Sequence, residues 1–240
     1  MLRVFCHHWD GGETLPELDR EERHHLFRVR RVRDGELVEL LNGRGARARC
    51  RVAAAAGGGR LAVESFQAIP SPALQVHLLV AVPKGKTFPA ILQKAVELGV
   101  SRISPLLTEH AAVPAERADR KQERWQAILV EALKQSGNPW LPELGEPLRL
   151  DQALVPREGA QRLCGALQPD ARPLWDLLER QLQPRGEMEV YIGPEGDFSQ
   201  REYASLRAVG CHFASLGPLV LKVETAAALM VGTLALWSNR

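Results

Sequence analysis

The sequence lacks the features that identify several large classes of protein. Its longest apolar run, around 225–237, is too short to span a bilayer and contains Gly232 and Thr233, so we do not expect a membrane protein. No secretion signal follows Met1, and we therefore expect a cytoplasmic protein in a reducing environment. Four cysteines are present, none of them in a CxxC spacing: Cys6, Cys50, Cys164 and Cys211. This scatter argues against a zinc site and against a disulfide framework.

Lysine is also scarce. Only 6 of the 31 basic residues are lysines, and none precedes Lys84. The formal net charge is +2, so the overall charge says little about partners. An excess of arginine suits RNA binding, because the planar guanidinium group binds phosphate in a bidentate manner. A genome-wide bias towards arginine and alanine explains the same composition, and the sequence leaves both interpretations open.

The first part of the chain, residues 1–70, has the pattern of a small β-barrel domain. Its predicted strands cover 36–41, 46–53 and 61–69, and a short helix is expected at 21–28. Asn42-Gly43 is a strong hairpin-turn signal between the first two strands. Pro70-Ser71-Pro72 then predicts a linker, because proline stops regular structure.

From Gln75 the pattern changes to alternating strands and helices, which predicts a mostly parallel α/β sheet over residues 74–240. The predicted strands lie at 76–82, 103–107, 162–167, 188–192 and 212–216. The predicted helices lie at 89–98, 117–135, 173–181, 199–208 and 224–237.

Two glycine-bearing loops stand out in the last fifty residues. Gly193-Pro194-Glu195-Gly196 follows one predicted strand, and Gly217-Pro218 follows the next. In open α/β sheets, ligands bind beyond the carboxyl ends of strands, and glycine lets the backbone approach a ligand closely. Glu195 and Asp197 argue against a phosphate ligand and are compatible with a cationic or neutral polar one. We therefore expect the two loops to wrap one small molecule side by side.

The last helix has almost no polar face over 226–236, which is typical of a core helix or of a subunit interface. We favour the interface, and hence a homodimer, because a second subunit would also close the glycine loops.

Lys84-Gly85-Lys86-Thr87 resembles the end of a phosphate-binding P-loop, but the rest of that motif is missing. A P-loop needs a glycine at position 80, where this chain has Val80 within a strand. A nucleotide-dependent α/β enzyme is therefore a third, disfavoured interpretation. Lys84 and Lys86 either face a nucleic-acid phosphate or lie in a solvated turn.

The segment 20–51 holds ten arginines and five acidic residues. Arg28, Arg30 and Arg31 cluster beside His24 and His25. Such a local excess of positive charge is a plausible RNA-binding surface, although a solvated face paired with nearby carboxylates fits equally well. The two histidines have no partners at metal-ligand spacing, so no metal site is expected.

The motifs GPEGDFS (193–199) and LGPLVLKVETAAAL (216–229) resemble the carboxyl half of SPOUT-class RNA methyltransferases. More narrowly, the chain resembles the RsmE family of 16S rRNA (uracil-N3)-methyltransferases. Segments 24–36, 94–100 and 123–137 carry the resemblance over nearly the whole chain.

The resemblance implies a PUA-like barrel that binds RNA at 1–70 and a SPOUT domain at 74–240, with a trefoil knot formed as 211–226 passes through an earlier loop. It implies a homodimer, S-adenosylmethionine as cofactor, and 16S rRNA in the small ribosomal subunit as partner. The implied cofactor-binding residues are Leu167, Ile192, Gly193, Pro194, Glu195, Gly196, Leu216, Gly217, Leu221, Thr225 and Ala226. The expected RNA-binding residues are His24, His25, Arg28, Arg30, Arg31, Lys84 and Lys86.

Three positions depart from the family pattern: Asn138, Asp197 and Lys222, where many relatives have arginine, glycine and arginine. Methylation at uracil N3 requires a proton to leave, and Lys222, Glu224 and Asn138 are the candidate catalytic residues. Lys222 would stabilise negative charge on the uracil oxygens, whereas Glu224 is equally suited to a dipole role at a helix start. A non-catalytic RNA-binding or ribosome-assembly protein with the same fold remains the alternative function.

Overall fold

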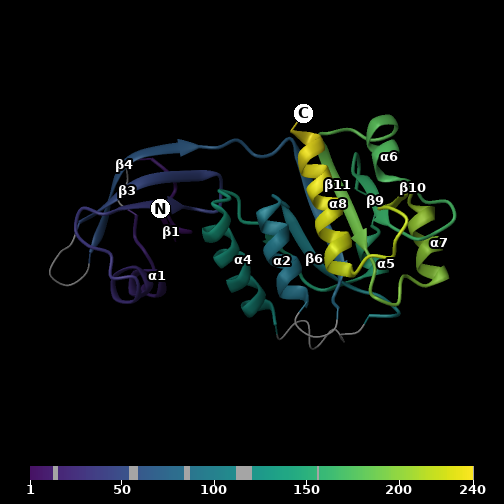
Figure 1. The fold of residues 1–240 in the computed structure, drawn as a ribbon, viewed down its shortest axis with the longest axis horizontal. Coiled ribbons are helices and arrows are strands. Elements are labelled where there is room, and N and C mark those ends of the chain that lie inside the picture. Colours follow the sequence, from purple (N-terminus) through teal and green to yellow (C-terminus); the bar gives the residue numbers. More distant parts are fainter. Residues whose placement is uncertain (13–15, 54–58, 84–86, 112–120, 156, 240) are drawn as a thin grey trace. The chain divides into compact units, whose positions relative to one another are not determined.

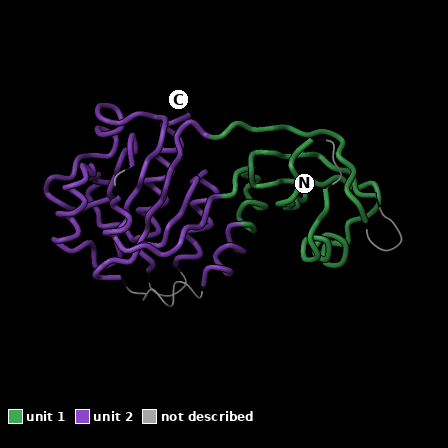
Figure 2. Tube along the Cα trace, turned by 180° about the vertical axis from the view of Figure 1, so that it is seen from behind, with its two compact units in different colours: residues 1–71, 130–141 green, residues 72–129, 142–240 purple. Residues whose placement is uncertain are grey.

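The computed structural model describes residues 1–12, 16–53, 59–83, 87–111, 121–155 and 157–239. They form two compact units (Figure 2). Unit 1 comprises residues 1–71 and 130–141, and unit 2 comprises residues 72–129 and 142–240.

Unit 1 is built around a mixed four-stranded sheet in the order β1-β2-β3-β4. β1 and β2 are parallel, and the other neighbouring strands are antiparallel. The elements of this unit are β1 (Leu2–Phe5), α1 (Arg20–His24), the π-helix η1 (His25–Val29), β2 (Leu37–Leu41), β3 (Ala46–Ala53) and β4 (Arg60–Ala68). The predicted helix over 21–28 is therefore split into an α-helical turn and a π-helical turn.

The β2–β3 hairpin confirms the sequence pattern. Along β3, buried and exposed residues alternate at every position, so Ala46, Ala48, Cys50 and Val52 face the core while the arginines between them face outwards. The turn depends on Asn42, whose Oδ1 accepts hydrogen bonds from the backbone N–H groups of residues 44 and 46. This Asx-type bonding explains why the turn forms at Asn-Gly.

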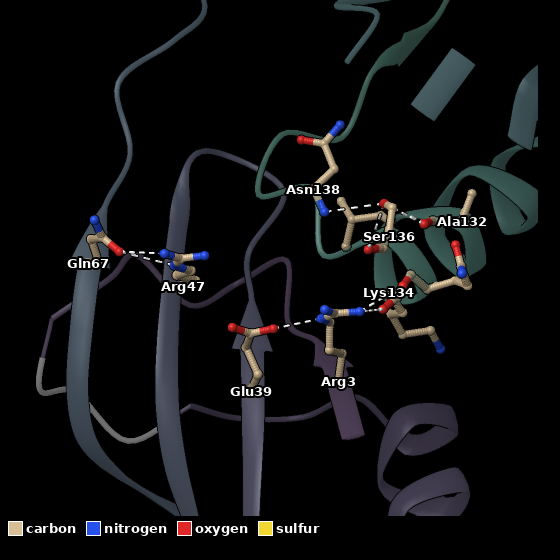
Figure 3. A network of polar contacts seen from close by, with 10 residues as sticks. Arg3, Glu39, Arg47, Gln67, Ala132, Lys134, Ser136 and Asn138 are labelled. Atoms are coloured by element: carbon tan, nitrogen blue, oxygen red, sulfur yellow. Dashed lines mark hydrogen bonds and ion pairs between the residues drawn. The ribbon is translucent and has the colours of Figure 1, made fainter. Parts of the chain in front are cut away.

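Residues 130–141 complete unit 1 although they are distant from it in sequence. Backbone N–H groups of Gly45 and Leu141 donate to the carbonyls of Pro139 and Gly43, both at 2.9 Å. Arg3 donates to Glu39 and to the last carbonyls of the helix that ends at Ser136 (Figure 3). A guanidinium group at a helix carboxyl end satisfies carbonyls that have no partner within the helix.

Unit 2 contains a sheet in the order β10-β12-β9-β11-β5-β6-β7, with β8 also paired to β6. Its paired strands are parallel, as predicted. The strands are β5 (Leu74–Ala81), β6 (Arg102–Leu107), β7 (Glu143–Leu144), β8 (Leu148–Arg149), β9 (Gln161–Gly165), β10 (Arg172–Pro173), β11 (Gly186–Ile192) and β12 (His212–Ser215). The helices are α2 (Thr87–Glu97), α4 (Gln122–Ser136), α5 (Leu150–Ala153), α6 (Leu174–Arg180), α7 (Gln200–Ala208) and α8 (Val223–Ser238).

Helices cover both faces of this sheet, which is why its central strands are apolar runs. On one face α8 packs against α2, β5 and β11 (Figure 1). On the other face, a core cluster joins strand residues such as Leu79, Tyr191 and Phe213 to Tyr203 and Leu206 of α7. None of the helices in the described ranges is long and apolar enough to cross a membrane.

The strand order corrects one expectation about the glycine loops. β9 lies between β11 and β12, so the two loops are separated by the segment that follows β9. Because all three strands are parallel, their carboxyl ends meet at one edge of the sheet. Three loops, rather than two, therefore converge there.

Candidate functional site

The three converging loops enclose a cavity of about 310 Å³. One wall is Gly165–Leu167 after β9, a second is the first glycine loop (residues 193–197) after β11, and a third is the second glycine loop (residues 216–222) after β12. The lining is mainly apolar, with a few charged groups at the edge. A concave, mostly apolar site with few polar groups is the usual form of a small-molecule binding site.

The first glycine loop is a tight turn closed by a hydrogen bond from Asp197 N to Pro194 O at 3.0 Å. A Cβ atom on Gly193 would lie 3.1 Å from the ring of Phe198, so a larger residue does not fit without movement. The loop runs into α7, whose first turn is closed by the predicted capping box. Ser199 Oγ accepts from Glu202 N at 3.2 Å, and Glu202 Oε2 accepts from Ser199 N at 2.8 Å.

Asp197 takes a backbone conformation that favours glycine. Its φ is +61°, which Asp tolerates better than most residues. Its Oδ1 accepts hydrogen bonds from Tyr203 Oη at 2.6 Å and from Phe198 N at 2.8 Å. Burial, and then the bond to Asp197, raise the pKa of Tyr203 well above its ordinary value, so this hydroxyl stays protonated as a donor. The departure from glycine is thus accommodated by bonds that the carboxylate makes.

A side chain of α7 holds the segment after β9 in place. Arg207 forms two hydrogen bonds with Asp170, both at 2.9 Å, and its guanidinium group lies 4.8 Å from the centre of the Phe213 ring. The bonds from Arg207 lower the pKa of Asp170, so the pair stays charged. A Cβ atom on Gly165 would lie 3.1 Å from Ile192, which keeps this wall close to the next strand.

The second glycine loop is more open. Gly217 has a φ of +128°, and nothing lies within 4 Å of the position of an added Cβ atom. Leu219 and Val220 are 73% and 79% exposed. Lys222 is exposed at the start of α8, and its carbonyl accepts from the N–H groups of Thr225 and Ala226.

Most of the predicted cofactor-binding residues line the cavity, together with Lys222: Leu167, Ile192, Gly193, Pro194, Glu195, Leu216, Gly217, Leu221 and Ala226. Gly196 belongs to the first glycine loop, and Glu224 and Thr225 lie in the first turn of α8, but none of the three lines the cavity. The lining also includes residues that the sequence reasoning missed: Gly165, Ala166, Asp197, Ala214, Leu219, Val220 and Val223. Ala166 falls within the predicted strand 162–167, near its carboxyl end, and this position was the available signal.

Asn138 lies in unit 1, whereas the cavity lies in unit 2. Its backbone N–H donates to Ser136 Oγ at 3.2 Å, and its Oδ1 accepts from Trp140 N at 2.9 Å. Figure 3 shows this turn, in which the Ser136 hydroxyl also bonds Ala132 O of α4. In this structure Asn138 therefore shapes the turn that ends α4.

The predicted RNA-binding residues lie on α1, η1 and the turn after them. The guanidinium groups of Arg28, Arg30 and Arg31 are exposed, and none forms an ion pair with a carboxylate of the described residues. His25 and Arg30 also line a second, polar cavity of about 380 Å³ within unit 1. Lys84 and Lys86 fall outside the described residues.

The arginines of β3 behave differently from those of η1. Arg49 and Arg51 both pair with Glu64, and Arg47 donates to Gln67. The positive charge of residues 20–51 that no neighbouring side chain offsets is therefore concentrated in the residues before β2. It is not spread evenly along the segment.

Two family models match the chain. The RNA methyltransferase domain model matches residues 70–235, and the RNA methyltransferase PUA domain model matches residues 18–64. The first match spans the three loops that enclose the cavity.

Named relatives agree with the family models. The chain is 31% identical over 217 residues to the ribosomal RNA small subunit methyltransferase E of Synechocystis sp., with 89% of this chain and 70% of the relative covered. It is 30% identical over 244 residues to the Mycobacterium bovis enzyme of the same name, covering 95% of this chain and 91% of the relative. The crystal structure of a ribosomal RNA small subunit methyltransferase E from Neisseria gonorrhoeae bound to S-adenosyl methionine is similar with a TM-score of 0.86 and 25% identity, over 97% of this chain and 96% of that one. This chain belongs to the RNA methyltransferase family that includes ribosomal RNA small subunit methyltransferase E.

Proposed function

We propose that this protein transfers a methyl group from S-adenosylmethionine to N3 of a specific uridine in the 16S rRNA of the small ribosomal subunit. The observation that carries the proposal is the cavity formed by three glycine-containing loops at one edge of the parallel sheet, in a chain of this family. The related Neisseria gonorrhoeae structure contains the same cofactor.

The residues around the cavity fit this cofactor. Ile192, Leu216 and Leu221 offer apolar surface to the adenine ring, and Gly193 and Gly217 allow close approach of the backbone. The carboxylate of Glu195 complements a cation, and Lys222 is the one basic side chain among the described residues that line the cavity, so the lining does not call for a phosphate. When bound, the cofactor supplies an electrophilic methyl group on a positively charged sulfur.

The protein must then hold uracil N3 in line with that methyl group and remove the N3 proton. N3 lies on the Watson–Crick edge, so the target base has to be unpaired or turned out of its stack. Lys222 stabilises the negative charge that develops on the uracil oxygens. Glu224, half-buried in the first turn of α8, is the proposed proton acceptor, although a carboxylate there also interacts favourably with the helix dipole. Asn138 remains the third proposed residue.

We also propose that the end of the chain is knotted and that unit 1 is a PUA-like barrel. The path of the chain supports the knot. After β11 the chain passes beyond β9 to form β12, and α8 then returns to pack against β11 and β5. If residues 216–222 return past the end of β9 through the loop that follows it, they form the trefoil knot of this proposal. The PUA family match at 18–64 supports the barrel.

A homodimer in the cytoplasm completes the proposal. Leu229 and Leu236 of α8 are 43% and 76% exposed, as expected of a helix that is covered by a second subunit. The molar mass in solution, measured by light scattering, tests this part: a monomer at micromolar concentration would exclude it.

Unit 1 would bind the RNA through phosphate contacts from His24, His25, Arg28, Arg30 and Arg31, together with Lys84 and Lys86 of unit 2. Replacing Arg28 and Arg31 by alanine should weaken RNA binding and reduce the slope of log affinity against log salt by about 0.9 per lost phosphate contact. Arg149→Ala is the matched control, because Arg149 is exposed but pairs with Asp151. Equal salt slopes in all variants would exclude this surface.

The enzyme activity is tested by mapping N3-methyluridine in 16S rRNA from cells that lack the protein. We expect one modified position to disappear, to return with the wild-type gene, and to stay absent with Lys222→Met. Lys94→Met, at an exposed lysine of α2, should restore it. Unchanged methylation combined with defective subunit assembly would favour the non-catalytic RNA-binding function. A comparison of purified free 16S rRNA with purified small subunits as substrates shows which of the two is methylated.

A further inference from the structure

His110 lies next to the cavity but does not line it. It follows β6, and its Nδ1 lies 3.1 Å from Gly196 O and 3.0 Å from Asp197 O. Both partners are carbonyl oxygens, which only accept hydrogen bonds. Nδ1 must therefore carry a hydrogen and donate to both, so the imidazole bridges two consecutive peptide groups of the first glycine loop.

A second contact ties the segment after β6 to α7, the helix that follows the first glycine loop. The backbone N–H of Glu109 donates to Glu202 Oε1 at 2.9 Å, while the other oxygen of Glu202 caps α7. The approach is close, because a Cβ atom on Gly196 would lie 3.2 Å from Cβ of His110. Residues 109–110 thus fasten the first glycine loop and the start of α7 to the segment after β6.

We infer that His110 is a positioning residue for the proposed cofactor site, whose imidazole group fixes the first glycine loop in the shape that receives the cofactor. The inference depends on the proposed function, since it assumes that S-adenosylmethionine occupies this cavity. His110 acts through the loop, because Gly193, Pro194, Glu195 and Asp197 line the cavity and His110 does not.

The surroundings of His110 favour its charged form. The hydrogen bond to the Asp197 carbonyl, followed by that to Gly196 and by the negative charges of Glu202 and Glu109, raises the pKa of His110 above its ordinary value of 6.5. The Asp197 carboxylate is turned to Tyr203 and Phe198 N. A raised pKa means that the stabilising contact is complete below pH 6.5 and weakens as pH rises through the folded-state pKa. Cofactor affinity should fall in the same direction.

Three variants distinguish the effect of His110 on the shape of the loop from the effect of its change of charge with pH. Calorimetric titration of S-adenosylmethionine between pH 6 and 9 should show a severalfold loss of wild-type affinity at the upper end, as charge-assisted bonds become neutral. His110→Ala should bind about tenfold more weakly at low pH and show little pH dependence. His110→Asn, whose amide donates from a similar position without titrating, should restore affinity and remain independent of pH. His8→Ala, which removes an exposed histidine of unit 1, is the control.

Hydrogen exchange of the cofactor-free protein gives an independent readout. Peptide N–H groups of residues 195–198 should exchange faster in His110→Ala than in the wild type or in His110→Asn. If the wild type binds the cofactor and all variants share its affinity, pH profile and exchange rates, the role of His110 is disproved while the proposed function stands. If the wild type binds no cofactor at any pH, both proposals fail. A His110→Ala variant that does not fold leaves the decision to His110→Asn.

Discussion

The two glycine loops of the cavity have similar sequences but differ in how firmly their surroundings hold them. Three contacts hold the first loop: the hydrogen bond that closes its own turn, the bond between the Asp197 carboxylate and Tyr203, and the bond from the imidazole of His110. In the second, the described side chains form one hydrogen bond to the loop backbone, from Ser215 Oγ to Gly217 O at 3.3 Å, and Leu219 and Val220 are exposed. A Gly-Pro dipeptide after a strand therefore marks a loop at a sheet edge, but its neighbours decide whether that loop is rigid.

This difference suggests a division of roles. The first loop is a wall formed before any ligand arrives, which reduces the entropy lost on binding. The second loop carries apolar side chains that gain cover only from a ligand or from another chain. We therefore expect substitutions in the first loop to alter both stability and affinity, and substitutions in the second loop to alter affinity alone.

The largest effect is expected for Gly193→Val. The added Cβ would meet the Phe198 ring at 3.1 Å, and the branched methyl groups would meet it more closely still. Overpacking of this kind costs about 2–3 kcal/mol, or about 100-fold in affinity if it acts on the binding site. Calorimetric titration of S-adenosylmethionine and a thermal melt should both show the loss. Wild-type affinity in this variant would contradict the assignment of the first loop.

A smaller effect is expected for Gly217→Val. The backbone there is in a region that favours glycine, but nothing surrounds the new side chain, so the free loop can relax into another shape. Restoring the shape that binds the cofactor should then cost about 1–2 kcal/mol. Affinity should fall about tenfold with an unchanged melting temperature. Gly159→Val is the control, because Gly159 also has a positive φ, at 76°, and open space, but lies away from the cavity. Equal losses of stability in Gly193→Val and Gly217→Val would remove the distinction between the loops.

The smallest effect is expected when Leu219 and Val220 are both changed to serine. Both side chains are largely exposed, so the free energy of unfolding should change by less than about 0.5 kcal/mol and the melting temperature should hardly shift. Affinity for S-adenosylmethionine should fall severalfold, because the cover these residues provide to a bound ligand is lost. A marked loss of stability would show that the second loop is already packed in the free protein.

Much of the fold was predictable because its signals are local. The alternation along β3, the helical spacing of Ile91, Leu92 and Val96, and the capping box at Ser199 each depend on neighbours within a few residues. The parallel sheet followed from the alternation of strands and helices, and most predicted cavity residues followed from the family resemblance and are found on its lining.

What the sequence could not predict depends on contacts between distant residues. The position of β9 between β11 and β12 brings Gly165 and Ala166 into the cavity, and no local pattern encodes strand order. The bridge from His110 to residue 197 spans 87 positions, and the bond from Arg3 to Lys134 spans 131. The tolerance of Asp197 for a positive φ likewise depends on Tyr203, six residues further on.

The assignment of residues 130–141 to unit 1 has a consequence for how the chain matures. Trp140 packs so closely on Gly45 that a Cβ atom on that glycine would lie 2.2 Å from its ring, and the β2–β3 turn takes backbone partners from Pro139 and Leu141. An amino-terminal fragment ending near residue 71 would therefore lack part of its own fold. During synthesis, the first-made strands must wait until residue 141 has emerged before they reach their final state. By then β5 and β6 of unit 2 have been made, whereas β11, the neighbour of β5, has not, so unit 1 can be completed while unit 2 still awaits most of its sheet.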